Sequence, residues 1–150
     1  MTAPNHALTG TLIGLTVGNP WLALPLALAS HFLCDAIPHY GAGQQAIATK
    51  WFQQQLIVEA LVCAFIVLIL AFLQPQHWVI GAVAAFVATS PDFMWINKFR
   101  RAQSGKPQLV KQAFILRFHA WIQWFERPSG AIVEIAWLTA MLVFLIPLVR

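Results

Sequence analysis

The chain has 150 residues, of which 59% are hydrophobic and only 9% are charged, with a formal net charge of +4. A soluble domain usually has about 25% charged residues, so this composition excludes an ordinary soluble globular protein. Several apolar runs approach the roughly 20 residues that a helix needs to cross a bilayer. We therefore expect an all-α integral membrane protein in which residues 1–150 form a single membrane-embedded helical domain.

The first two predicted helices form a hairpin. They cover Pro4–Val17 and Pro20–Ile37, and the turn signal Gly18-Asn19-Pro20 joins them. At about 1.5 Å per residue the first helix is about 20 Å long, which is too short to cross a bilayer comfortably. We expect both ends of the hairpin to emerge on one side of the membrane.

Small residues recur every four positions on both helices of this hairpin. They are Gly10, Gly14 and Gly18 on the first helix and Ala23 and Ala27 on the second. Because small residues let membrane helices approach closely, we expect the two stripes to face each other. This packing would bring His6 to the level of His31 and Asp35.

Three longer helices follow the polar loop Tyr40–Thr49. The first is predicted over Lys50–Leu73 and the last over Gly130–Val149. The middle helix begins near His77 and is interrupted at Ser90-Pro91-Asp92. The predicted fold is thus an N-terminal helical hairpin, three membrane helices and one interfacial amphipathic helix.

The interfacial helix is expected in the second half of the basic stretch Lys98–Arg127, which has seven basic residues and one acid, Glu126. The positive-inside rule places this stretch and Lys50 on the cytoplasmic side, where basic side chains would contact anionic lipid headgroups. No nucleic-acid recognition motif accompanies the charge, so we expect no nucleic-acid partner. We expect the face that carries His119, Gln123 and Glu126 to be a wet polar face.

The segment HFLCDAIPH places His31, Asp35 and His39 at four-residue intervals at the end of the second apolar helix. Ionisable side chains in an apolar membrane helix are costly and usually functional. Pro38 disfavours helix at Ile37, so the helix is predicted to end there and His39 to lie in the first turn of the loop.

Further polar residues are expected at the same depth. Along their helices, Asp92 lies about 9 Å from Lys98 and Glu59 about 14 Å from Lys50. Together with the hairpin, this predicts one layer near the cytoplasmic face that contains His6, His31, Asp35, Glu59 and Asp92.

Purely structural roles are alternatives for these residues. His31 and Asp35 could form a hydrogen-bonded pair between packed helices that satisfies only its own polar groups. Asp92 could follow a Ser90 N-cap at the start of a helix, where the helix dipole favours a carboxylate. Whether His119, Glu126 and Glu134 join the site is left open.

Histidines and carboxylates in one layer suit a mixed nitrogen and oxygen metal site. The predicted ligands or near-ligands are His6, His31, Asp35, His39 and Asp92. Zinc is the first expectation, with manganese or iron as alternatives, and the lack of cysteine ligands argues against a closed structural zinc site. Glu59 is the predicted general base.

At these residues the chain resembles a family of small bacterial inner-membrane proteins described as metal-dependent hydrolases. The resemblance is carried by NHALTGTLIG with His6, SHFLCDAIPH with His31, Asp35 and His39, and TSPDF with Asp92. It implies a multi-pass protein of the bacterial inner membrane that binds a metal ion. Members often carry a fuller Pro-Asp-x-Asp-His string, whereas here Phe93, Met94 and Trp95 follow Asp92.

Three functions are compatible with these features. The first is metal-dependent hydrolysis of an ester or phosphoester, and the basic rim would suit an anionic, lipid-linked substrate. The second is a small cation or proton transporter, because transporters use interrupted helices and buried carboxylates. The third is a non-catalytic membrane scaffold.

Overall fold

The computed structural model describes residues 1–41, 49–105 and 114–150, and no β-strand occurs among them. The predicted all-α fold class is confirmed. The helices are α1 Ala3–Val17, α2 Pro20–Ala36, α3 Lys50–Leu73, α4 Trp78–Thr89, the 3-10 helix η2 Ser90–Trp95, α5 Ile96–Gln103, α6 Phe114–Ile122, the short η3 Pro128–Gly130, α7 Ala131–Leu145 and the short η4 Ile146–Leu148. Most of the predicted loop Tyr40–Thr49 lies outside the described residues.

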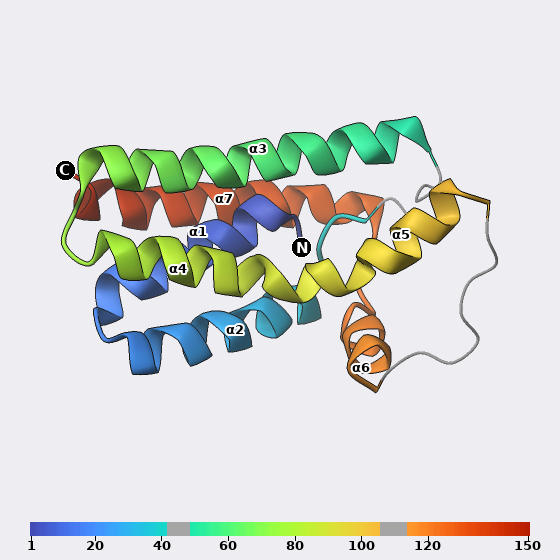
Figure 1. Cartoon of the computed structure of the whole chain (residues 1–150), viewed down its shortest axis with the longest axis horizontal. Helices are drawn as coiled ribbons and strands as arrows, with labels where there is room; N and C mark the ends of the chain where they lie inside the picture. The colour runs from blue at the N-terminus through green and yellow to red at the C-terminus, as the bar shows by residue number, and fades with distance from the viewer. Residues whose placement is uncertain (42–48, 106–113) are drawn as a thin grey trace.

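Within this part of the chain, three helical runs are long and apolar enough to span a membrane. They cover Lys50–Leu73, Trp78–Gln103 and Pro128–Leu148. Figure 1 shows α3, α4 and α7 running in roughly the same direction, with α1 in contact with all three and α2 packed against α1 and α4. These lengths and compositions agree with a membrane protein.

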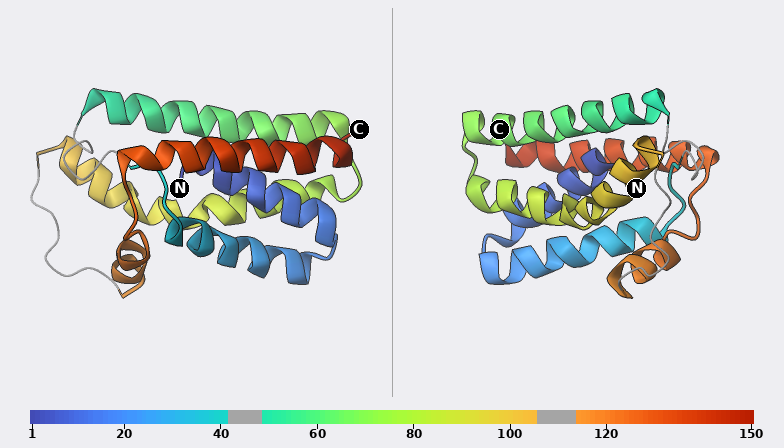
Figure 2. Two further views of the ribbon diagram at one scale, coloured as in Figure 1. Left: turned by 180° about the vertical axis from the view of Figure 1, so that it is seen from behind. Right: turned by 45° about the vertical axis from the view of Figure 1, so that its right-hand side comes forward.

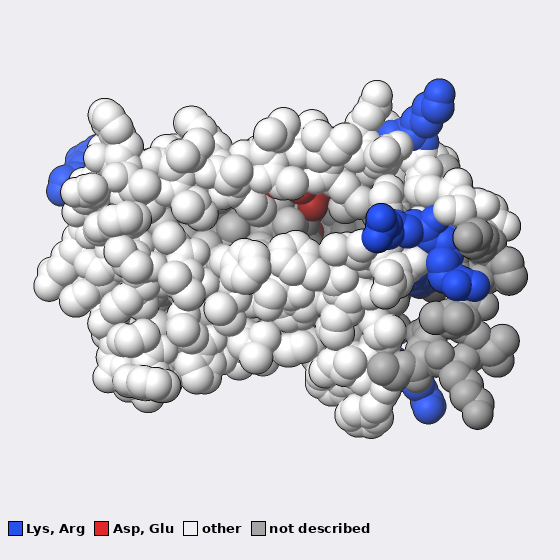
Figure 3. Space-filling model, viewed as in Figure 1, with Lys and Arg blue, Asp and Glu red and all other residues white. Residues whose placement is uncertain are grey.

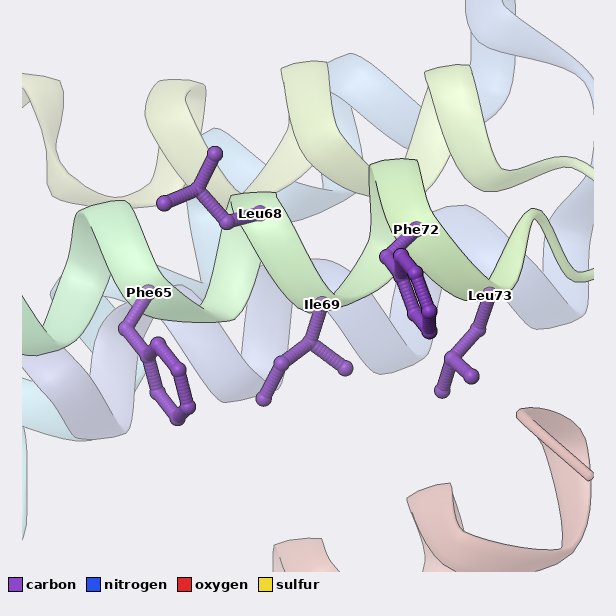
Figure 4. A pocket seen from close by; sticks show the side chains of 5 residues that line it. All are labelled: Phe65, Leu68, Ile69, Phe72 and Leu73. Carbon is purple, nitrogen blue, oxygen red and sulfur yellow. The ribbon is translucent and has the colours of Figure 1, made fainter.

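The outer surface of α3 is apolar. Phe65, Leu68 and Phe72 are 61%, 64% and 87% exposed. With Ile69 and Leu73 they line a shallow depression that no polar group enters (Figure 4). A surface of this kind suits contact with lipid chains, and it offers no group that could do chemistry.

The hairpin forms as predicted, with a turn built from Gly18 and Asn19. Gly18 has a φ of 65°, in the left-handed region that glycine adopts without strain. The Asn19 side chain accepts a hydrogen bond from the backbone N–H of Trp21 and so caps α2.

The predicted packing of the glycine stripe against α2 is wrong, because the glycines face α4. A Cβ at Gly10 would lie 2.4 Å from the Ala84 oxygen, and one at Gly14 would lie 2.5 Å from the Gly81 Cα. Ala27 of α2 also packs against α4, beside Ala84. Small residues on three helices therefore meet along α4, which brings α1 and α2 close to the same helix.

The predicted interruption of the fourth helix is confirmed, and its geometry is a 3-10 turn. Pro91 has no N–H to donate to the Val87 carbonyl one turn earlier, and the Ser90 hydroxyl donates to that oxygen instead, at 2.8 Å. Ser90 is the first residue of η2 and does not cap it, but Pro91 and Asp92 lie in its first turn, as the helix-start alternative expected. Beyond η2 the chain continues as α5, a separate helix that the sequence did not predict.

Basic side chains gather near one end of the bundle. Figure 3 shows them beside α5, while acidic atoms reach this face only in a hollow near its middle. The polar groups described next lie toward the same end, where α2 ends and α5 and α6 meet the bundle (Figure 1).

Candidate metal centre

Four side chains from three elements bring one potential ligand atom each into a single cluster. His31 and Asp35 come from α2, Asp92 from η2 and His119 from α6, and their ligand atoms all lie within 4.8 Å of one another. The side chains of His31, Asp35 and His119 are 0% exposed, whereas that of Asp92 is 31% exposed. We call these four residues the metal cluster.

The distances within the metal cluster match those expected around one ion. The Nε2 atoms of His31 and His119 are 3.0 Å apart, and the Asp35 Oδ2 atom lies 3.3 Å and 2.9 Å from them. Bonds of about 2.0–2.1 Å to a tetrahedral ion would separate ligand atoms by about 3.3 Å. The Asp92 Oδ1 atom is slightly further away, at 3.8 Å from His31 and 3.9 Å from His119.

The tautomer of His31 is set by α4. Its Nδ1 lies 2.8 Å from the Ala88 carbonyl oxygen, which can only accept a hydrogen bond, so Nδ1 carries the proton. In neutral His31 the Nε2 lone pair then points into the metal cluster. The Ala88 carbonyl is available because α4 ends at Thr89, and the carbonyls of a last helical turn have no partner within the helix.

His119 is the member of the metal cluster that the sequence did not predict. We expected a wet polar face, and this is wrong for His119, which is 0% exposed and stands against the rings of Phe32 and Trp95. Its Nδ1 atom is buried without a hydrogen-bond partner among the described residues. The sequence contained one indication, because His119 and Gln123 are four residues apart and so share a helix face. In the structure both side chains contact Asp35.

His6 supports Asp35 from the other side. Its Nε2 lies 3.1 Å from Asp35 Oδ1, while Oδ2 points to the metal cluster. The His6 ring also stacks on His31, with 4.1 Å between centroids. The predicted proximity of His6 to His31 and Asp35 is confirmed. His6 is not one of the four residues of the metal cluster, and it contacts the Asp35 oxygen that faces away from the cluster. The Met1 amino group contacts the same Oδ1 atom.

His39, the remaining predicted histidine ligand, lies away from the metal cluster. Its Nδ1 donates to the Ile37 carbonyl at 2.9 Å, and its own carbonyl accepts from the Arg127 N–H at 3.0 Å. Burial lowers the pKa of His39, which favours the neutral ring. None of the described hydrogen bonds links its side chain to Asp35 or Asp92, and the contact with the loop at Arg127 is made by its backbone.

Glu59, the predicted base, and Glu134, whose role was left open, both accept hydrogen bonds from the start of the chain around the first residue of α1. Glu59 accepts from the Gln55 side chain at 2.8 Å and from the Ala3 N–H at 3.2 Å. Glu134 accepts from the backbone N–H and the hydroxyl of Thr2, at 2.9 Å and 2.7 Å. Through these contacts the two glutamates fix the start of the helix that carries His6.

Comparisons with protein-family models, with curated proteins and with solved structures found no match to this chain. The metal cluster must therefore be interpreted from its own chemistry. Two imidazoles and two carboxylates form a donor set typical of zinc, iron or manganese, and the two carboxylates would balance the charge of one divalent ion.

Proposed function

We propose that the protein is a membrane-embedded, metal-dependent hydrolase that acts on an ester or phosphoester near the cytoplasmic face. The observation that carries this proposal is the convergence of four ligand atoms from α2, η2 and α6 within 4.8 Å. Zinc is the metal we favour, and manganese and iron suit the same donors.

The residues present fit a divalent ion. His31 offers a lone pair in a fixed tautomer. The Nε2 atom of His119 donates to Asp35 Oδ2 at 2.9 Å, and it would exchange that hydrogen bond for a bond to an ion, releasing the proton. A hydrogen bond from His6 orients the Asp35 carboxylate, as outer partners of metal ligands commonly do.

A divalent ion in the metal cluster would polarise a phosphoryl or acyl oxygen and provide a nucleophile at neutral pH. The side chain of Asp92 is 31% exposed, so substrate and water would approach along it. Asp92 is also better placed than Glu59 to accept a proton, because both Glu59 oxygens already accept hydrogen bonds.

The surroundings favour an anionic substrate that partitions into the membrane. Arg100 is exposed on α5, which follows η2, and Arg117 is exposed on α6, the helix that carries His119. Basic groups at headgroup depth attract phosphate-bearing lipids. A lipid-linked phosphoester is thus the substrate class we favour.

Metal content of the purified full chain in detergent tests the proposal. We expect about one zinc or other divalent ion per chain, measured by mass spectrometry, and loss of that ion in His31→Gln and in His119→Gln. His39→Gln is the matched control, because His39 is a buried histidine outside the metal cluster, and we expect it to keep the ion.

Folded parent protein without metal after growth in ample zinc, manganese and iron would contradict the proposal. Loss of metal in His39→Gln alone would contradict the site. If metal is bound, hydrolysis of a phospholipid or lipid phosphate by the parent and not by Asp92→Asn supports the enzyme. Metal or proton flux in proteoliposomes without hydrolysis would instead support a transporter.

A further inference from the structure

Helix α6 has one face in the metal cluster and a different face that nothing in the described chain covers. Phe114 and Trp121 are 82% and 73% exposed. They are seven residues apart, which is close to two full turns, so they lie on the same face. His119 lies about 140° around the helix axis from Phe114 and is 0% exposed.

The contacts of α6 with the rest of the protein are few and lie on its inner side. The Phe118 and Phe32 rings are 5.6 Å apart, and the Trp124 indole N–H, just after the helix, donates to the Ala36 carbonyl at 3.2 Å. A helix of nine residues is marginal by itself and depends on what packs against it. Among the described residues, His119 is held from the inner side of α6 alone, and a partner on the outer face would add to this support.

The bilayer surface is the partner that suits this face. The chain reaches α6 from one candidate span, Trp78–Gln103, and leaves it for another, Pro128–Leu148, so α6 lies at a membrane surface if both spans cross. Figure 2 shows α6 beside the end of α2 and not parallel to α3 and α7. Tryptophan and phenylalanine favour the interfacial layer, and exposed Arg117 would meet anionic headgroups.

We propose that Phe114 and Trp121 dock α6 into the interfacial layer of an anionic bilayer, and that this docking holds His119 in the metal cluster. The inference rests on the proposed metal site, and it makes ion binding depend on lipid. A chain whose α6 is not docked would keep His31, Asp35 and Asp92 but would lose its fourth ligand.

The test compares two double variants in nanodiscs that contain phosphatidylglycerol. Phe114→Ser with Trp121→Ser removes the docking face, and Trp21→Ser with Phe72→Ser removes two exposed aromatic residues at the far ends of α2 and α3. In the first variant we expect backbone hydrogen exchange of residues 114–122 to become faster and Co²⁺ affinity to fall about tenfold. The control should match the parent in α6 exchange and in Co²⁺ affinity, and exchange in α7, which carries none of the four substitutions, should be unchanged in both.

A second measurement needs no substitution. Co²⁺ should bind the parent more weakly in nanodiscs of phosphatidylcholine alone than in those with phosphatidylglycerol, because the headgroup attraction is lost. Equal affinity in the two lipids and in the docking variant would overturn the coupling. So would faster exchange in α6 with unchanged Co²⁺ affinity.

Two other outcomes are informative. Protection of α6 that depends on protein concentration in detergent, and not on lipid, would identify a second copy as the partner and overturn the proposal. Parent protein that binds no Co²⁺ would remove the metal site and with it the coupling, while the exchange data would still decide whether α6 docks on lipid.

Discussion

Asp35 is the residue around which the polar groups of this protein are arranged. Its Oδ2 atom faces His119 and the Gln123 side chain, at 2.9 Å and 3.0 Å, and its Oδ1 atom faces His6 at 3.1 Å. A fully buried carboxylate is costly unless it is paired and hydrogen-bonded. The surrounding donors meet this need, and they also fix the direction in which Oδ2 points.

The different positions of His6 and His31 lead to a prediction at this scale. His6→Ala should weaken Co²⁺ binding by about 10–100-fold, because it removes a partner of a ligand and not a ligand. His31→Ala should abolish binding. Both affinities can be measured by competition with a chromophoric chelator. Equal and complete loss in the two variants would show that His6 is itself a ligand.

At the scale of elements, α4 determines how the hairpin packs. It receives Gly10 and Gly14 from α1 and Ala27 from α2, and its last turn supplies the carbonyl that holds His31. The element boundaries followed from proline, glycine and apolar run length, and the structure confirms Lys50–Leu73 as predicted. The partner of the glycine stripe could not be predicted, because a stripe of small residues indicates close approach but not which helix approaches.

The close contact between α1 and α4 predicts that Gly14→Ala destabilises the protein. A Cβ there would meet the Gly81 Cα at 2.5 Å, and neither backbone can yield locally. Overpacking costs about 1–3 kcal/mol, which outweighs the roughly 1 kcal/mol that alanine gains in helix propensity. For a chain of this size each kcal/mol lowers the unfolding midpoint by about 2–4 °C.

Thermal unfolding in detergent measures this effect. Thr16→Ala is the control, because Thr16 is exposed and its hydroxyl bonds only to carbonyls of its own helix. We expect the control to change stability by less than about 0.5 kcal/mol. An unfolding midpoint of Gly14→Ala at or above that of the parent would contradict the close contact between α1 and α4.

At the scale of the whole molecule, the basic side chains of α5 and the metal cluster lie toward the same end of the bundle (Figures 1 and 3). The sequence predicted much of this layer, because helix length converts directly into depth once the spans are known. It could not predict His119, because a short amphipathic helix has two plausible orientations and only tertiary packing shows which face is buried. It also assigned His39 to the site from its spacing, although the chain turns away at Pro38.

The orientation of the molecule can be tested by labelling engineered cysteines. Ser104 follows α5 and Gln76 lies in the turn between α3 and α4, and both are exposed. The positive-inside rule predicts that an impermeant maleimide labels Ser104→Cys only in inside-out vesicles and Gln76→Cys only in right-side-out vesicles. A Cys34→Ser, Cys63→Ser background removes the native free thiols. The reverse pattern would place the metal cluster on the outer side.

Pro91 affects the geometry of the metal cluster although its own side chain is not part of it. An alanine there would let α4 continue as a regular helix, in which the Asp92 amide would take the Ala88 carbonyl. His31 would lose the acceptor that fixes its proton, and the Asp92 carboxylate would turn to another direction. The ability to hold an ion is therefore encoded partly in a backbone irregularity, and a search for ligand residues alone would overlook it.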